Sequence, residues 1–468
     1  MFERCASGIF SQYEVEEHLL HAQRNIFDYI DNRLYNMFDS LVIGNPKRDS
    51  SARTGNASWY PYYAGFSPKF AYDILTTLSL ASNAVVLDPW NGSGTTTCSS
   101  ASLGFHSIGY DLNPVMVIAA KARALSRRLK SSLEAISKNI LKSAKKRKPY
   151  FSNDDPLLTW IRPMGASYIR LLQNSINVNL ISETAQTNLT IPENMNVLSD
   201  LAAFYYIALF RTTRQILKPF IGSNPTWIKK PHSKSRRLSP SKECVFSFFE
   251  SSVRQMIDAI DGESYIGVSY KEDISCRIAS STNLPLENST VDFILSSPPY
   301  CTRIDYAVAT APELAVLGYD MTSDFVQLRK KLIGTSMVGN EITNQNELWG
   351  NVCNDFLTKL KSHESKSSGS YYYKNHLHYF HAMYESIAEI GRVSKVQGKC
   401  ILIVQDSYYK ELHNDVPAII TDMMKVQKYN LCRHEAFSMR NSMAAINPKV
   451  RKYRQNPFAT ESVLCFSR

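Results

Sequence analysis

The feature that limits the possible folds most strongly is a strand, a glycine loop, a helix and a second strand in close succession. Strands expected at 84–87 and 106–110 flank a loop that contains Gly92 and Gly94, and Asp111 follows the second strand. The glycines allow a tight turn and close approach to a ligand, and the helix N-terminus offers free N–H groups. A carboxylate about twenty residues beyond such a loop can accept hydrogen bonds from ribose hydroxyls. The stretch predicts a nucleoside-binding α/β unit.

The same stretch is a poor dinucleotide fingerprint. Thr97 replaces the third glycine of that fingerprint, and no other phosphate cradle follows. A nicotinamide dehydrogenase is therefore only a distant alternative.

A second motif lies about two hundred residues further on, in the segment VDFILSSPPY at 291–300. Its apolar half predicts a buried strand that the two prolines end. Ser297 offers a hydroxyl, the prolines offer carbonyls and Tyr300 offers an aromatic face, a set that suits a planar group with an exocyclic amine. The alternative interpretation is a strand followed by a proline turn with an incidental tyrosine.

Composition limits the setting of this chemistry. The chain has 468 residues and a net charge of +11, which weakly favours a polyanionic partner. Its nine cysteines form no CxxC pair, which indicates a reducing compartment, and the first twenty residues place acids where a signal peptide needs an apolar core. No apolar stretch is long enough to cross a membrane. We expect a cytoplasmic, nucleoid-associated bacterial or archaeal protein.

Three stretches are rich in lysine and arginine: 126–150, 229–237 and the loop that holds Arg440 and Lys449 to Arg454. Such runs are usually solvated surfaces, and contact with nucleic acid is the competing interpretation for them. Apolar residues at helical spacing over 195–220 predict that 120–265 is a mostly helical insertion between the second and third core strands.

The remaining core is expected in the second half of the chain. The predicted strands are 274–279, 291–296, 400–404, 431–437 and 461–466. A helix after Tyr300 is expected to break at Pro312, and 320–375 is expected to be a second, partly mobile insertion. His376, His378 and His381 are interpreted as part of a packed helix and not as a metal site, because no cysteine or carboxylate completes a ligand set.

The glycine loop and the Ser-Pro-Pro-Tyr motif together resemble those of the DNA amino-methyltransferases, which use S-adenosylmethionine to methylate the exocyclic amine of cytosine or adenine. The Ser-Pro-Pro-Tyr form is most similar to the N4-cytosine branch. Further similarity lies at Asp305-Tyr306, Glu313-Leu314, Leu317-Gly318 and Arg440-x-Ser442-Met443. The resemblance covers about 59–125, 274–335 and 376–468, and it implies a Rossmann-like, seven-stranded class I methyltransferase sheet with a reversed last strand and helical insertions.

The resemblance also assigns domains and residues. It implies an N-terminal helical segment (1–58), a cofactor-binding half (59–125), a basic helical insertion for target recognition (126–270) and a catalytic half (271–468). The residues implied to bind S-adenosylmethionine are Phe66, Pro68, Asp88, Pro89, Gly92, Ser93, Gly94, Thr95, Thr96, Asp111 and Ser281. Those implied to hold the target base are Ser297, Pro298, Pro299 and Tyr300.

Two residues depart from the family pattern. Trp90 stands where phenylalanine is usual, and Ser281 stands near where an acid is common. The expected partners are double-stranded DNA and a cognate restriction endonuclease or other defence-system subunits. The alternatives are an N6-adenine DNA methyltransferase, a tRNA guanine-N2 methyltransferase, and a non-catalytic DNA-binding defence subunit that kept only the scaffold.

Overall fold

The computed structural model describes residues 38–47, 55–60, 65–181, 188–222, 227–261, 274–301, 305–338, 344–439 and 459–468. Several expectations lie outside these residues. They are the N-terminal helices before residue 38 and the basic loop that begins at Arg440. In the part of the chain that is described, no helix has the length and apolar character needed to cross a membrane.

A seven-stranded sheet forms the centre of the molecule, as the sequence predicts. Its order is β3-β2-β1-β4-β5-β9-β8, and β9 alone runs antiparallel to its neighbours β5 and β8. The reversed last strand is therefore confirmed. The strands are β1 (Val85–Asp88), β2 (His106–Asp111), β3 (Ile274–Ile278), β4 (Val291–Ser296), β5 (Ser394–Gln405), β8 (Asn430–Met439) and β9 (Ala459–Ser467). A separate hairpin pairs β6 (Ser407–Tyr409) with β7 (Leu412–Asn414).

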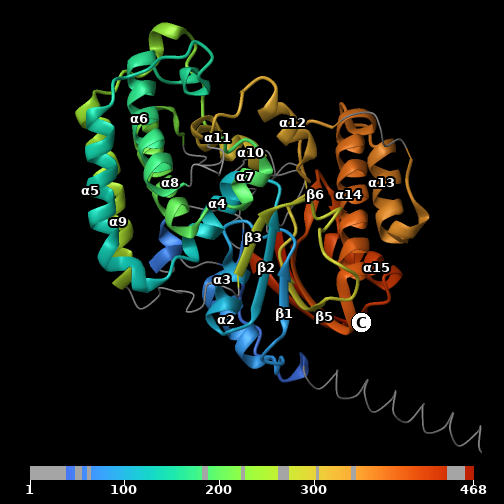
Figure 1. Cartoon of the computed structure of the whole chain (residues 1–468). Helices are drawn as coiled ribbons and strands as arrows, with labels where there is room; N and C mark the ends of the chain where they lie inside the picture. Colours follow the sequence, from blue (N-terminus) through green and yellow to red (C-terminus); the bar gives the residue numbers. More distant parts are fainter. Residues whose placement is uncertain are drawn as a thin grey trace, which may run out of the picture.

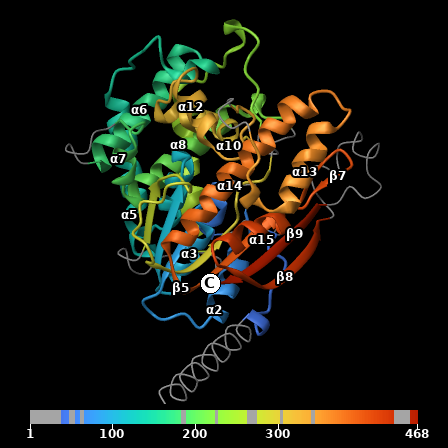
Figure 2. The same ribbon diagram turned by 90° about the vertical axis from the view of Figure 1, so that its right-hand side faces the viewer.

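Alternating side chains of the central strands cover two faces, because successive residues of a strand point to opposite sides. One face packs on α2 (Pro68–Thr77) and the other on α14 (Tyr373–Val393) and α15 (Val416–Val426). The first face contributes Val86, Phe293, Ile401 and Val463, and the second contributes Leu87, Ile294, Leu402 and Leu464. Figures 1 and 2 show the sheet between these helices. Helix α3 (Thr95–Ser102) lies beside α2.

The helices expected between the second and third strands are present and have a core of their own. They stand together to one side of the sheet in Figure 1. They are α4 (Pro114–Arg123), α5 (Lys130–Lys146), α6 (Pro163–Leu180), α7 (Pro192–Asn196), α8 (Asp200–Ile216) and α9 (Lys242–Asp258). Arg170 of α6 ties this bundle to the next segment, since it pairs with Asp155 and donates to the carbonyls of Ala315 and Val316.

The segment after β4 contains α10 (Tyr306–Ala309), α11 (Ala311–Leu317), α12 (Asp324–Lys331) and α13 (Asn351–Ser362). The helix break falls at Thr310, so the expected break at Pro312 is wrong. Pro312 lies in the first turn of α11, where a missing N–H costs no helical hydrogen bond. Within the second expected insertion, α13 packs on α14 through Phe356, which contacts the rings of His376 and Phe380. Figure 2 shows α13 and α14 side by side.

The strand β5 begins six residues earlier than predicted, at Ser394 instead of Cys400. Gln397, with φ of 68°, and Gly398 lie inside it, and the pairing with β4 is irregular at this point. The Gln-Gly pair therefore marks an irregularity within the strand and not the loop before it.

Candidate functional site

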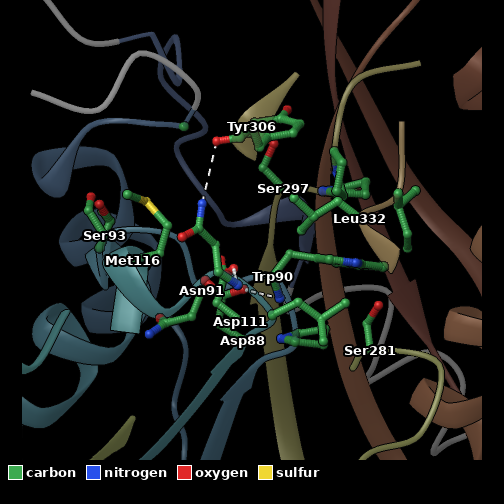
Figure 3. A pocket seen from close by; sticks show the side chains of 18 of the residues that line it. Asp88, Trp90, Asn91, Ser93, Asp111, Met116, Ser281, Ser297, Tyr306 and Leu332 are labelled. Atoms are coloured by element: carbon green, nitrogen blue, oxygen red, sulfur yellow. Dashed lines mark hydrogen bonds between the residues drawn. The ribbon is translucent and has the colours of Figure 1, made fainter. Parts of the chain in front are cut away.

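A cavity opens at the carboxyl ends of β1, β2 and β4, where both sequence motifs end. Because β1 lies between β2 and β4 in the sheet, the segments that follow these three strands meet in one place. The glycine loop (residues 88–96) forms one wall and the proline loop (residues 297–300) forms another. In the close view, Ser297 and Tyr306 lie on one side of the cavity and Asp88 and Asp111 on the opposite side (Figure 3). Such a position is usual for ligand sites in open α/β sheets.

The shape of the glycine loop depends on Gly94, which has φ of 80° and precedes α3. A side chain there would place its Cβ 2.8 Å from the Cβ of Ala120 on α4. Only glycine fits both the backbone conformation and this contact. Asn91 braces the loop, since its backbone N–H donates to the Tyr110 carbonyl and its side-chain oxygen accepts from Thr97.

A buried arginine fixes the end of this loop. Arg123, at the end of α4, donates from Nη1 to the Ser93 carbonyl at 2.7 Å and to the Ser93 hydroxyl at 3.1 Å. Burial lowers the pKa of this guanidinium, and nearby Cys98 and Cys276 oppose the effect. The helical region after β2 therefore holds the glycine loop in place.

Two carboxylates, Asp88 and Asp111, lie at the floor of the cavity, and each accepts hydrogen bonds from backbone N–H groups. Asp111 accepts from the Gly92 N–H at 3.0 Å and from the Asn113 N–H at 2.8 Å. Asp88 accepts from the Trp90 N–H at 3.1 Å. Burial raises the pKa of Asp88 to about 6 and that of Asp111 to about 7, because removal from water disfavours the charged form. Both groups therefore change charge close to neutral pH.

The two motif loops are joined directly. The Ser296 hydroxyl, at the end of β4, donates to Asp88 Oδ1 at 2.5 Å. The Thr96 hydroxyl donates to the Leu295 carbonyl at 2.9 Å. These contacts span about two hundred residues of sequence and fix the distance between the two walls.

Two tyrosines, the buried Tyr379 and the half-buried Tyr306, hold the proline loop. The Tyr379 hydroxyl of α14 donates to the Pro299 carbonyl at 2.9 Å, and the Tyr306 hydroxyl accepts from the Tyr300 N–H at 3.2 Å. Among the described residues, the Ser297 hydroxyl and the Pro298 carbonyl make no hydrogen bond, although both residues line the cavity. The loop thus keeps two acceptors for a ligand while its neighbouring polar groups are satisfied.

Most of the site residues that the sequence predicts line this one cavity. They are Phe66, Asp88, Pro89, Ser93, Thr95, Asp111, Ser281, Ser297, Pro298, Pro299 and Tyr300. Pro68, Gly92, Gly94 and Thr96 do not line it. Pro68 starts α2 behind Ser67, the two glycines shape the loop, and the Thr96 side chain faces β4.

Sequence reasoning missed several lining residues, chiefly Asn91, Asn113, Met116, Arg214, Thr310 and Leu332. Asn113 donates to Thr310 at 2.9 Å and so closes the wall between α4 and α10. Arg214 of α8 pairs through Nε and Nη2 with Glu313, a fully buried carboxylate. The Asp-x-Asn-Pro sequence after β2 was a usable signal for Asn113 as a helix cap. Arg214 carried no local signal, because its partner is a hundred residues away.

Ser281 reaches the cavity from the loop after β3, and its hydroxyl lies 2.9 Å from that of Ser386. No acid takes its place nearby, since Asp88 and Asp111 are the only carboxylates among the described lining residues. In Figure 3, Ser281 and Trp90 lie at one end of the cavity, and Ser93 and Met116 lie at the other.

The histidines of α14 take part in packing. Burial lowers the pKa of His376 to about 4, and its Nδ1 lies 2.8 Å from the Tyr372 carbonyl. His381 pairs with Glu385 on the same helix. Over the described ranges, no group of three or more histidine, cysteine or acidic residues is arranged to hold a metal ion.

Comparison with known proteins finds similarity to three bacterial methyltransferases. The chain is 26% identical over 310 residues to the type II methyltransferase M.BsoBI of Geobacillus stearothermophilus, a match that covers 62% of this chain and 59% of that protein. It is 23% identical over 295 residues to the type II methyltransferases M.AvaI of Nostoc sp. and of Anabaena variabilis, covering 60% of this chain and 58% of each. The matches thus span less than two thirds of these relatives. No protein-family model matches the chain.

Proposed function

We propose that this chain is an S-adenosylmethionine-dependent DNA methyltransferase that methylates the N4 amine of cytosine in a restriction-modification system. The observation that carries the proposal is the shared cavity, in which the glycine loop faces a proline loop with two acceptors that have no hydrogen-bond partner among the described residues. The similarity to type II methyltransferases supports the reaction class. The choice of the N4 amine rests on the Ser-Pro-Pro-Tyr form of the proline loop.

The residues of the cavity fit a nucleoside cofactor with an amino-acid tail. Asp111 is placed beyond the glycine loop, as a carboxylate that accepts from ribose hydroxyls must be. At the Ser93 end, Gly94 lets the loop backbone pack closely against Ala120 of α4, and Ser93 lines the cavity that a ligand would fill. Phe66 and Tyr60 add buried aromatic side chains to the lining. We assign the methionine portion to the Ser93 end and the adenine to the end near Ser281.

When bound, S-adenosylmethionine supplies a methyl group on a positively charged sulfur, which is open to attack by a lone pair. The protein must make that lone pair available, because the exocyclic amine of a nucleobase shares it with the ring. The Ser297 hydroxyl and the Pro298 carbonyl each accept one hydrogen bond from the amine. Their positions pull its hydrogens out of the ring plane, so that the lone pair becomes free. Positioning and electrostatics then supply the rate enhancement.

The attacking amine carries a positive charge until one of its protons leaves for solvent. Asp88 receives the Ser296 hydroxyl at 2.5 Å, one residue before Ser297, and its pKa of about 6 suits a group that exchanges protons near neutral pH. The Asp88 carboxylate stabilises the positive charge that develops on the amine, and solvent takes the proton afterwards.

A base inside a duplex cannot reach this cavity, so the target cytosine must turn out of the helix. Tyr300 lines the cavity and offers the extruded base a stacking face. We assign duplex contacts to the exposed basic residues of 229–237 and of α5. The first stretch is held on the helical region, since the Lys229 carbonyl accepts from Trp160 and the Ser235 carbonyl accepts from Arg162. We also propose that a restriction endonuclease with the same recognition sequence acts alongside this chain.

The proposal is tested by incubating the purified chain with S-adenosylmethionine and unmethylated plasmid DNA, followed by mass spectrometry of the digested nucleosides. N4-methylcytosine is the expected product. N6-methyladenine would keep the DNA methyltransferase assignment and overturn the choice of base. Methylguanine in tRNA, with unmodified DNA, would establish the RNA enzyme. Failure to bind the cofactor in calorimetry, with DNA binding retained, would favour the non-catalytic DNA-binding subunit.

A further inference from the structure

The indole N–H groups of four tryptophans differ in whether they have a partner. Trp59 donates to the Met256 carbonyl and Trp160 to the Lys229 carbonyl, each at 3.0 Å. The N–H groups of Trp90 and Trp349 are covered from solvent and have no partner among the described residues. Trp90 lines the cavity, whereas Trp349 lies in the core beside α13 and α15. A buried donor without an acceptor is unfavourable, so a cavity-lining one points to a ligand.

The position of Trp90 shows which part of a ligand it would meet. Its backbone N–H is held by Asp88, and in Figure 3 its indole extends toward Ser281, away from Ser93 and Met116. On the proposed function, this is the adenine end of the cavity. Both carboxylates of the lining are already engaged by backbone N–H groups near the floor. Among the described lining residues, the adenine end therefore offers two polar side-chain groups, the Ser281 hydroxyl and the Trp90 N–H.

We propose that Trp90 recognises the adenine of the cofactor by donating its indole N–H to a ring nitrogen of that base. The inference rests on the proposed function and deepens it by naming a specificity-determining residue. Adenine has three ring nitrogens with a lone pair in the ring plane, N1, N3 and N7, and each is an acceptor. A phenylalanine at this position presents a ring face alone, but the indole adds a donor in the ring plane. The indole N–H can therefore distinguish adenine from a ring that lacks the acceptor nitrogen.

Ser281 supports this assignment. Its hydroxyl lies 2.9 Å from the Ser386 hydroxyl, and that of Ser386 lies 2.8 Å from the Ala382 carbonyl. When Ser386 donates to Ala382, its oxygen accepts from Ser281, and the Ser281 hydrogen is used within the protein. Ser281 then offers adenine an oxygen lone pair for the exocyclic amine. The Trp90 indole N–H then remains as the side-chain donor for a ring nitrogen of adenine.

The test measures binding of S-adenosylhomocysteine and its 1-deaza, 3-deaza and 7-deaza analogues by calorimetry, without any turnover. The wild type should bind one deaza analogue about five- to tenfold more weakly than the parent, the loss expected for one neutral hydrogen bond. Trp90→Phe should bind the parent about five- to tenfold more weakly and should bind that same analogue equally well as the parent. The convergence of the two ligands in the variant is the signature of a direct hydrogen bond.

Trp349→Phe is the matched control, because it removes an equally buried and unpartnered indole N–H outside the cavity. It should leave the wild-type discrimination unchanged. If Trp90→Phe does not fold, site-specific benzothienylalanine at position 90 keeps the bicyclic shape and replaces the N–H by sulfur.

The possible results separate failure of the Trp90 hydrogen bond from failure of the proposed function. Equal discrimination among the deaza analogues in wild type and Trp90→Phe would overturn the hydrogen bond while leaving the proposed function intact. Absence of binding of S-adenosylhomocysteine to the wild type would overturn the proposed function itself, and the Trp90 inference with it.

Discussion

The two loops that face each other across the cavity differ in how they use their polar groups. In the glycine loop, the polar side chains are engaged within the protein, as the contacts of Asn91 with Thr97 and of Thr96 with Leu295 show. In the proline loop, Tyr306 and Tyr379 engage the flanking groups, while the acceptors of Ser297 and Pro298 have no partner in the described part of the chain. The internal hydrogen bonds of the glycine loop fix its shape. The proline loop keeps acceptors available for hydrogen bonds from a ligand.

This difference predicts two kinds of variant. A change in the glycine loop should alter the shape of the site and weaken cofactor binding. A change at the free acceptors of the proline loop should leave cofactor binding intact and slow the chemical step. If variants of both loops change cofactor affinity and methylation rate in the same way, the proposed difference between the loops is wrong.

The largest effect is expected for Ser297→Ala. The substitution removes one of the two acceptors for the amine, and the loss of one such positioned group typically costs about a hundred- to a thousandfold in rate. Affinity for S-adenosylhomocysteine should change less than about twofold, because Ser297 is not assigned to the cofactor. Single-turnover methylation of DNA and calorimetry with the cofactor product measure the two quantities separately.

Ser102→Ala is its control, since the Ser102 hydroxyl donates to the Ser99 carbonyl at the end of α3 and is absent from the cavity lining. Methylation at a wild-type rate by Ser297→Ala would remove the assigned role of the free acceptors.

The second effect concerns Gly94→Ala. An added Cβ would lie 2.8 Å from Ala120 Cβ at a residue with φ of 80°, so the loop must shift. Overpacking together with backbone strain costs about 2–4 kcal/mol, and we expect cofactor affinity to fall about ten- to a hundredfold. Gly104→Ala is the matched control. Gly104 has φ of 84°, but nothing lies within 4 Å of its added Cβ.

Both variants should lose stability through backbone strain, which thermal unfolding can measure. Only Gly94→Ala should lose cofactor affinity. Equal affinities for the two variants would show that the approach of α4 to the glycine loop does not shape the site.

The sequence was most informative where function depends on a local pattern. The sequence predicts each of the seven strands of the sheet, and the clearest signals are short apolar runs such as 291–295, which two prolines follow closely. A serine followed by a proline is a local pattern typical of a helix start, and at α2 the Ser67 hydroxyl accepts from the Phe70 N–H. Eleven of the fifteen predicted site residues line the cavity, and all of them except Phe66 lie at or after the ends of strands that are neighbours in the sheet.

The missed residues depend on contacts that no local pattern encodes. Tyr379 lies among the histidines that the sequence assigns to a packed helix, yet its hydroxyl reaches Pro299, eighty residues earlier. Arg214 lies in an apolar helix, and its role at the cavity follows from the fold that brings α11 and Glu313 against it. Partners of this kind are set by tertiary packing, which spacing along the chain cannot reveal.

The third prediction uses the raised pKa of Asp111. At pH 8 the carboxylate is mostly ionised and can accept from ribose hydroxyls, whereas at pH 6 it is mostly protonated, given a pKa of about 7. Affinity for S-adenosylhomocysteine should therefore fall about tenfold between pH 8 and pH 6, or less where Asp88 titrates in parallel. In Asp111→Asn the affinity should be low throughout and nearly independent of pH in this window.

Stability should depend on pH with the opposite sign. A carboxyl whose pKa is higher in the folded than in the unfolded state binds its proton more tightly when folded. The free protein should therefore become more stable, through this group, as the pH falls from about 7 to about 4. Denaturant titrations with and without cofactor separate this effect from binding. A cofactor affinity that rises toward pH 6 would show that Asp111 acts as a protonated donor.

The smallest effect is expected for Tyr379→Phe, which tests whether the proline loop needs its support. The substitution leaves the Pro299 carbonyl without the hydroxyl that donates to it at 2.9 Å. Because Pro299 adjoins the free Pro298 carbonyl, a small shift of the loop misplaces an acceptor of the amine. We expect kcat to fall about three- to tenfold, with the KM for S-adenosylmethionine unchanged.

Tyr429→Phe provides the comparison that isolates this effect. Tyr429 is as deeply buried, and its hydroxyl bonds to Ser394 at the start of β5, at the amino end of the strand and away from the cavity. Both variants should unfold at lower denaturant, since each loses one buried hydrogen bond. Only Tyr379→Phe should lose kcat. If the two variants lose kcat in proportion to their loss of stability, the proline loop is rigid by virtue of its prolines alone, and the contrast between the loops lies in their backbones rather than in the tyrosines that flank them.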